Sequence, residues 1–127
     1  MLINDPATLA DATAAFHAYE QALMANDLDA LDALFWPSDF TVRIGPGQNL
    51  YGIDAIKAFR AARVGGSPQR SLLKLVITTF GTDFATANAE FQRVGAPAPG
   101  RQSQSWVRFP EGWRVVSAHI SMLGEGH

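Results

Sequence analysis

The sequence predicts an α+β domain in which three N-terminal helices pack on one face of a curved, mostly antiparallel sheet. Two observations lead to this fold class. Apolar residues recur at spacings of three and four over much of residues 6–62, which is the period of a helix. Residues 71–121 instead change side-chain type at every second position, which is the period of a strand. No repeat or linker divides the chain, so residues 1–127 form one predicted domain.

Three segments have the periodicity and the end signals of helices. The first covers about residues 6–24, with Asp5 as its cap and Pro6 in its first turn. Its predicted buried face consists of Leu9, Ala12, Phe16, Tyr19 and Leu23. A second, short helix over residues 28–35 ends at Trp36, because the following proline disfavours helical geometry there. A third begins near Ile53 and stops at two glycines, residues 65–66.

The predicted strands are residues 40–44, 71–80 and 84–94, followed by a hairpin in which residues 110–112 connect 100–109 to 113–121. If Phe109 pairs with Trp113, one face of the hairpin collects Val107, Val115, Ser105, Ser117, Ser103, His119 and Arg101. We interpret this mixed face as the wall of a polar-lined pocket. Trp106, Val116 and Ile120 lie on the opposite face and predict a homo-oligomer, a dimer through the outside of the sheet.

Composition excludes several classes of protein. The chain has no cysteine, which excludes disulfides and thiolate chemistry. A net charge of −2 and the lack of a basic run argue against nucleic acid as a partner. No apolar run approaches the roughly 20 residues of a membrane span, and no signal-peptide pattern starts the chain. We therefore expect a cytoplasmic protein with no membrane partner. The three histidines lack carboxylates at ligand spacing, so no metal site is predicted.

Basic residues are unevenly distributed. Residues 1–42 contain no lysine or arginine, and all 10 basic residues lie between Arg43 and Arg114. Most of them are arginines, whose planar guanidinium matches a carboxylate. A basic surface next to an acidic one explains this distribution. The alternative is that some arginines point inward, toward a small anionic ligand.

Six short motifs of this chain point to one known family. They are residues 34–36 (LFW), 50–52 (LYG), 59–63 (FRAAR), 84–88 (FATAN), 100–104 (GRQSQ) and 118–121 (AHIS). The order of the elements resembles the nuclear-transport-factor-2-like superfamily, the cone-shaped α+β fold of SnoaL-like and ketosteroid-isomerase-like proteins. Within it these motifs are similar to those of the AtzH-like 1,3-dicarboxyurea decarboxylases of bacterial cyanuric acid breakdown.

The resemblance implies an essential pair, because these decarboxylases use a tyrosine of the first helix and an arginine of the first strand. Tyr19 and Arg43 occupy the matching positions. An inward-facing phenol is also suited to donate a proton. Arg60 lies on the apolar stripe of the third helix and is a candidate to bind substrate, as is Trp36 of the first motif.

The hairpin contributes the other candidate binding residues. His119 is a candidate because the residue at the matching position lines the pocket in SnoaL-like proteins. A lone histidine on a strand, however, usually has a structural role. Ser105 and Gln104 have opposite parity, so only one of them joins His119. Simple pairing favours Ser105, and a single bulge would exchange it for Gln104.

The resemblance implies the function of a small, cofactor-free decarboxylase acting on an N-carboxylated urea, 1,3-dicarboxyurea, to give allophanate and carbon dioxide. Arg43 would hold one carboxylate, Tyr19 would supply the proton, and Arg60 and His119 would bind the second carboxylate. One alternative is a ketosteroid-isomerase-like proton-transfer enzyme, which needs a carboxylate base such as Glu90 on an inward face. The other is a non-catalytic ligand-binding or association domain linked to an amidase.

Overall fold

Residues 1–124 fold as three helices on one curved sheet of six strands. The computed structural model describes residues 1–124. The helices are α1 (Pro6–Ala25), α2 (Leu28–Ala33) and α3 (Ile53–Ala62). The strands are β1 (Val42–Gly45), β2 (Gln48–Tyr51), β3 (Arg70–Phe80), β4 (Phe84–Arg93), β5 (Gly100–Phe109) and β6 (Gly112–Met122). The predicted α+β class is confirmed.

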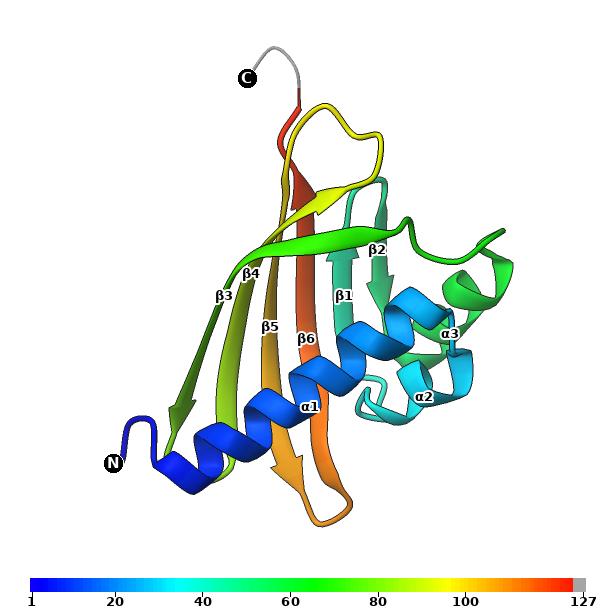
Figure 1. Ribbon diagram of the computed structural model, residues 1–127. Coiled ribbons are helices and arrows are strands. Elements are labelled where there is room, and N and C mark those ends of the chain that lie inside the picture. The colour runs from blue at the N-terminus through cyan, green and yellow to red at the C-terminus, as the bar shows by residue number, and fades with distance from the viewer. Residues whose placement is uncertain (125–127) are drawn as a thin grey trace.

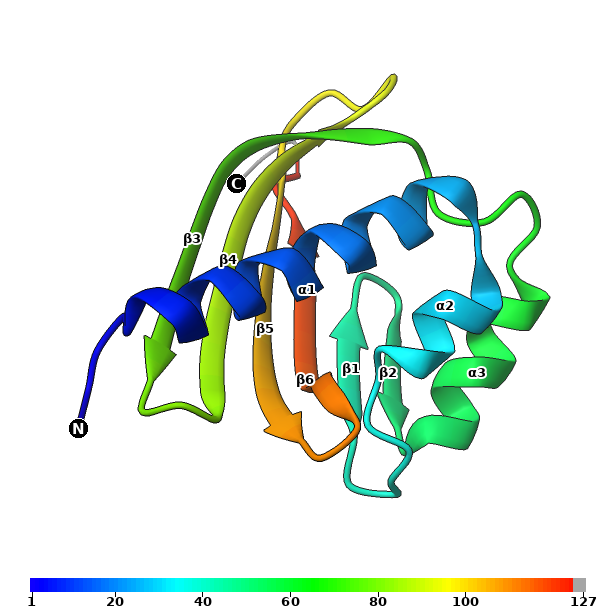
Figure 2. The ribbon, with the colours of Figure 1, turned by 60° about the horizontal axis from the view of Figure 1, so that its bottom comes forward.

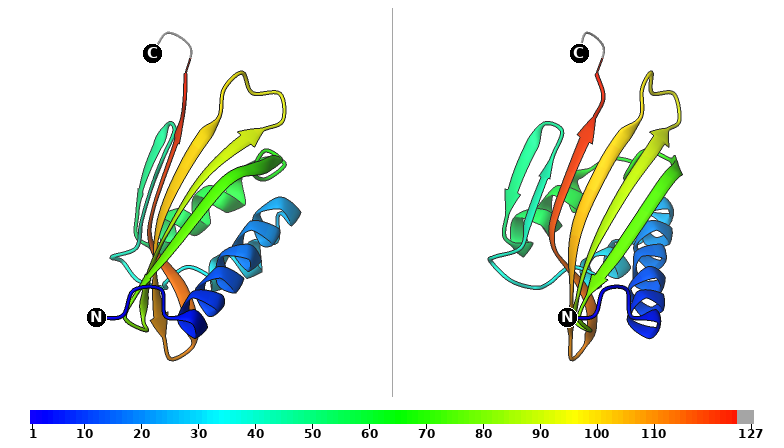
Figure 3. Two further views of the ribbon diagram at one scale, coloured as in Figure 1. Left: turned by 60° about the vertical axis from the view of Figure 1, so that its left-hand side comes forward. Right: turned by 90° about the vertical axis from the view of Figure 1, so that its left-hand side faces the viewer.

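The strands follow the order β2-β1-β6-β5-β4-β3, and every neighbouring pair is antiparallel except β1 with β6. Figure 1 shows α1 crossing the sheet diagonally, with α2 and α3 beside the β1–β2 hairpin. The turned view in Figure 2 shows the long strands bending over α1. The side views in Figure 3 show helices on only one side of the sheet. We call the side that α1 covers the inner face and the other side the outer face.

Local chemistry fixes both ends of α1. The side chain of Asp5 accepts a hydrogen bond from the Thr8 amide at 3.2 Å, and Pro6 occupies the first turn, as predicted. The helix ends where Asn26 adopts a left-handed conformation, with φ of 53°. This residue type tolerates that geometry better than most. These caps fix how far α1 extends across the inner face.

Small residues on β4 leave room for the helix. Ala85, Ala87 and Ala89 are buried and alternate with exposed or half-buried residues. Large aromatic residues fill the remaining space: the Tyr19 ring lies 6.2 Å from Phe35 and 6.4 Å from Trp106, measured between centroids. Aromatic side chains bury large apolar areas, so this cluster anchors α1 to the sheet.

A bulge in β6 corrects the predicted hairpin register. Ser105 pairs with Ser117, as predicted, but Trp106 pairs with Val115, which leaves Val116 without an opposing residue. Below the bulge the register is therefore shifted by one residue, and Phe109 pairs with Gly112 instead of Trp113.

The predicted outer surface is wrong in its main residues. Trp106 and Ile120 are 2% and 5% exposed and belong to the inner face, whereas Ser103 and His119 are exposed on the outer face. The prediction assigned the two faces of the sheet by side-chain type. This failed because the inner face also carries polar side chains and the outer face carries few large apolar ones. Association through the sheet stays a prediction, without the support that these two side chains were expected to give.

Candidate functional site: buried donors on the inner face

Arg43 projects from β1 onto the inner face and is only 8% exposed. Its guanidinium carbon lies 5.1 Å from the centre of the Phe59 ring of α3. Burial lowers the pKa of Arg43 to about 10, with smaller contributions from the neighbouring charges of Arg63, Arg60 and Arg93. Arg43 therefore remains charged at neutral pH, but folding leaves that charge poorly solvated.

Tyr19 of α1 lies close to this guanidinium. The residue is 4% exposed, with its ring held between those of Phe16, Phe35 and Trp106. Its phenol is the group that acts to raise the pKa of Arg43, against the effect of burial. Two side chains that are 24 positions apart in the sequence are thus brought together by the packing of α1 over β1.

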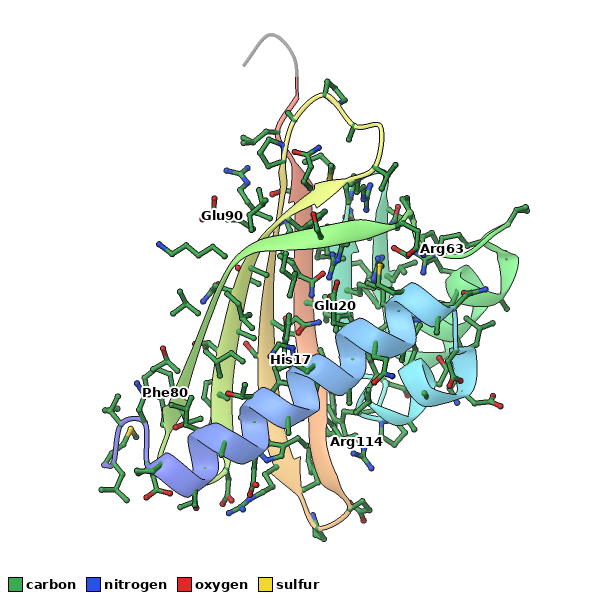
Figure 4. All side chains as sticks on the ribbon, viewed as in Figure 1. His17, Glu20, Arg63, Phe80, Glu90 and Arg114 are labelled. Atoms are coloured by element: carbon green, nitrogen blue, oxygen red, sulfur yellow. The ribbon has the colours of Figure 1, made fainter. Side chains whose placement is uncertain are left out.

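Two further arginines complete what we call the arginine cluster, Arg43, Arg63 and Arg93. The Arg63 guanidinium carbon lies 5.3 Å from the centre of the same Phe59 ring, and Figure 4 shows Arg63 just after α3. Burial is the main effect that lowers the pKa of Arg63 and of Arg93; the Tyr19 phenol opposes it at Arg63, and repulsion from other arginines adds to it at both. Within residues 1–124, none of the three forms a salt bridge. The cluster is an uncompensated positive site that an anion would stabilise.

Two glutamines of β5 present more donors beside the cluster. Gln102 and Gln104 are each 2% exposed and face inward. Trp106 Nε1 donates to Gln104 Oε1 at 2.9 Å, and Arg70 Nη1 donates to Gln102 Oε1 at 3.1 Å. Because indole and guanidinium groups can only donate, these bonds fix each amide with its NH₂ group on the other side. Both amide nitrogens are buried without a partner in the described part of the chain.

The position of Gln104 relative to Arg43 follows from the strand register. Gln104 and Arg43 both pair with Ala118 of β6, one from each side. The side chain that lies between the two polar groups on the inner face is therefore only that of an alanine. Gln104, which the sequence offered as the alternative to Ser105, is therefore the residue that lies in the row of Arg43.

Arg60 has a different environment from the one predicted. Its Nη1 lies 2.8 Å from Asp32 Oδ1, and its guanidinium carbon is 4.1 Å from the centre of the Phe35 ring. The residue is 4% exposed, so this ion pair links α3 to α2 in the interior. A guanidinium already bound to a carboxylate is poorly placed to bind a second one. Arg63 and Arg93, which lack such a partner, are the better candidates.

The predicted inward positions of His119 and Ser105 are wrong, and Trp36 lies apart from Tyr19 and Arg43. His119 lies on the outer face, in a shallow groove formed with Arg101, Ser103 and Ser121. Ser105 shares that outward parity through its pairing with Ser117. Trp36 stacks on Phe40 and Phe109 at centroid distances of 6.3 and 5.5 Å. It lines a separate hollow whose lining includes neither Tyr19 nor Arg43.

The outer position of His119 gives a direct test. We expect His119→Ala to change neither turnover nor anion binding by more than about twofold, because surface substitutions usually have small effects. Steady-state kinetics and calorimetric titration of both proteins check this. A loss of tenfold or more in a folded His119→Ala protein would place the functional site on the outer face instead.

Carboxylates contribute little to the inner site. Glu20 is bound to Arg70 and Asp32 to Arg60, while Glu90 is exposed on the outer face. Among residues 1–124 there is no group of three or more histidine, aspartate or glutamate side chains that could hold a metal ion. The arrangement is thus built from donors: arginines, amide NH₂ groups and one phenol. Such a site binds a ligand rich in acceptors.

Sequence patterns matched over the whole chain identify its relatives. The AtzH-like family matches residues 1–126. The chain belongs to the AtzH-like family. A protein of unknown function from Pectobacterium atrosepticum is 52% identical over 96% of this chain and 95% of its own, with a TM-score of 0.93. A cystatin-like fold protein from Burkholderia xenovorans is 45% identical over 98% of both chains, also with a TM-score of 0.93.

More distant structures share the fold alone. A nuclear transport factor 2-like superfamily protein from Salmonella enterica is 23% identical over 95% of this AtzH-like chain and 94% of its own, with a TM-score of 0.76. It confirms the predicted superfamily fold. No match was found among functionally curated proteins. None of the helices within residues 1–124 is both long and apolar enough to cross a membrane.

Proposed function

We propose that this AtzH-like protein is a cofactor-free decarboxylase that converts 1,3-dicarboxyurea into allophanate and carbon dioxide. The observation that carries the proposal is the buried, uncompensated Arg43 next to the phenol of Tyr19. The arginine provides a carboxylate-binding group and the phenol provides a proton, and the proposed reaction needs both. Family membership supports the same reaction.

Substrate binding is the first task of the site. Arg43 offers guanidinium N–H groups to one carboxylate, and the Gln104 amide, in the same row across β6, offers another donor. Low exposure strengthens each of these interactions, because little water competes for the carboxylate. A bound carboxylate would also lessen the repulsion among the arginines of the cluster.

The chemical step breaks one C–N bond. As carbon dioxide leaves the N-carboxylate, the electron pair of that bond passes to the urea nitrogen and is delocalised into the urea carbonyl. Tyr19 donates its hydroxyl proton to this nitrogen and later regains one from water. Donors around the urea oxygen stabilise the developing charge.

Two other functions receive less support. A ketosteroid-isomerase-like reaction needs a free carboxylate base beside the substrate, and the inner-face carboxylates Glu20 and Asp32 are bound to arginines. A non-catalytic binding domain would use the same arginine cluster but would not need Tyr19 next to it. Turnover therefore separates the proposed decarboxylase from a binding domain.

The test is the release of carbon dioxide from isotope-labelled 1,3-dicarboxyurea, followed by NMR, with and without the purified protein. We expect an acceleration that saturates with substrate and yields allophanate in equal amount. His119→Ala serves as the matched control, because its side chain lies on the outer face. An unaccelerated reaction in the presence of folded protein would refute the decarboxylase.

The setting of this reaction is also a proposal. Allophanate and dicarboxyurea belong to the breakdown of cyanuric acid and related s-triazines as nitrogen sources. We propose that the protein works there in the cytoplasm, as a dimer, on a small anionic substrate. Sedimentation at several concentrations measures the oligomeric state directly.

A further inference from the structure

A second set of buried donors lies one step along β5 from the Arg43 row. Gln104 lies in that row, while Gln102 lies two residues along and pairs with Ile120. Residues that follow each other on one face of a strand are about 6.5 Å apart. The amides of Gln104 and Gln102 therefore offer donors at two separate places on the inner face.

The Gln102 amide is fixed by a buried ion pair. Arg70 donates to Glu20 twice, from Nε at 3.0 Å and from Nη2 at 2.6 Å, and a third time to Gln102 Oε1. Figure 4 shows Glu20 between α1 and the strands behind it. With its oxygen occupied, Gln102 has only its NH₂ group left for a ligand. Glu20 and Arg70 thus act as positioning residues for this amide.

Arg93 adds a charge beyond Phe91, on the same face of the sheet as Gln102. Arg93 pairs with Arg70 across β3 and β4, and both guanidinium carbons lie over the Phe91 ring, at 5.6 and 4.3 Å from its centre. Glu20 neutralises Arg70, whereas Arg93 Nε is buried without a partner in residues 1–124. Arg93 is therefore the uncompensated cation at the Gln102 end of the site.

We infer that Gln102 and Arg93 form a second carboxylate-binding site, so that the inner face binds a dicarboxylate with its other carboxylate on Arg43 and Gln104. This inference rests on the proposed function and deepens it, because it assigns the residues that hold the second carboxylate. It replaces Arg60, which is bound to Asp32, and His119, which faces outward. Gln104 and Gln102 are separated by one two-residue repeat of β5. This spacing favours a ligand whose two carboxylates are joined by a three-atom bridge over one whose two carboxylates are attached to the same carbon atom.

Binding of unreactive acids tests the inference independently of turnover. Glutarate has two carboxylates joined by three carbons, and pentanoate replaces one of those carboxylates by a methyl group. We expect the wild-type protein to bind glutarate at least tenfold more tightly than pentanoate in calorimetric titrations. Arg93→Met and Gln102→Leu should each weaken glutarate binding by about 10- to 100-fold. Neither substitution should change pentanoate binding.

Arg101→Met is the matched control, because Arg101 is next to Gln102 in sequence but exposed on the outer face. It should leave the affinity for both acids unchanged. Thermal melts check folding, and Arg93→Met keeps the test decisive if Gln102→Leu fails to fold. Equal wild-type affinity for the two acids, or unchanged glutarate binding in folded Arg93→Met, would overturn the inference. Selective glutarate binding without decarboxylation would instead refute the proposed reaction and leave the second carboxylate site in place.

Discussion

Replacing Arg43 by methionine is expected to reduce kcat/KM for 1,3-dicarboxyurea by about 10³-fold or more, because one group supplies both the charge and the fork that orient the substrate. The fold should survive. Arg43 forms no salt bridge within the described residues, and its buried charge is repelled by the rest of the arginine cluster. We therefore expect the melting temperature of Arg43→Met to equal or exceed that of the wild type.

Two companion variants sharpen this result. Arg43→Lys keeps the charge but loses the planar fork, so it should recover only part of the lost affinity. Arg108→Met removes an arginine that is 38% exposed and paired with Asp83, and it should leave kcat/KM unchanged. Wild-type kinetics in a folded Arg43→Met protein would show that the substrate carboxylate binds elsewhere.

The second large effect is expected from Tyr19→Phe, which removes a single oxygen atom. If the phenol is the proton donor, kcat should fall by about 10²- to 10⁴-fold. Stability should change by about 1 kcal/mol or less, because no hydrogen bond to the Tyr19 hydroxyl occurs within residues 1–124 and the ring contacts remain. The measurement is single-turnover decarboxylation alongside thermal unfolding.

Tyr51→Phe is the matched control, since Tyr51 is 67% exposed on β2. It loses the same oxygen at a position away from the interior, so its kcat should equal that of the wild type. If Tyr19→Phe and Tyr51→Phe are equally active, the phenol of Tyr19 is not the acid, and a water molecule must supply the proton.

Local signals explain why most of the fold could be predicted from the sequence. Asp5 and Pro6 mark the start of α1, and the long strands β3 and β4 alternate clearly enough to be located within one residue. β2 was missed because its four residues, Gln48–Tyr51, are too short for a periodic pattern. The parallel pairing of β1 with β6 was also beyond the sequence, because it joins residues about 75 positions apart.

The site was predicted only in part, for a physical reason. Tyr19 and Arg43 followed from a family resemblance, and the phenol acts to raise the pKa of this arginine. The sequence did not show that the glutamines of β5 face inward, because buried glutamines normally need hydrogen-bond partners that a sequence does not reveal. Gln102 and Gln104 have those partners in Arg70 and Trp106. Arg93 is the cation at the end of β4, the strand with alternating alanines. It could have been predicted as a site residue if the sequence showed which face of β4 points inward.

The bulge at Val116 determines which side chains of β6 face the interior. Below it Val115 faces inward, and above it Ala118 and Ile120 do, although simple alternation would send them outward. If Val116 instead continued the alternation that starts at Val115, Ser117 and His119 would face α1. One irregular residue in β6 therefore keeps hydroxyl and imidazole groups out of the interior and places the small side chain of Ala118 between Gln104 and Arg43.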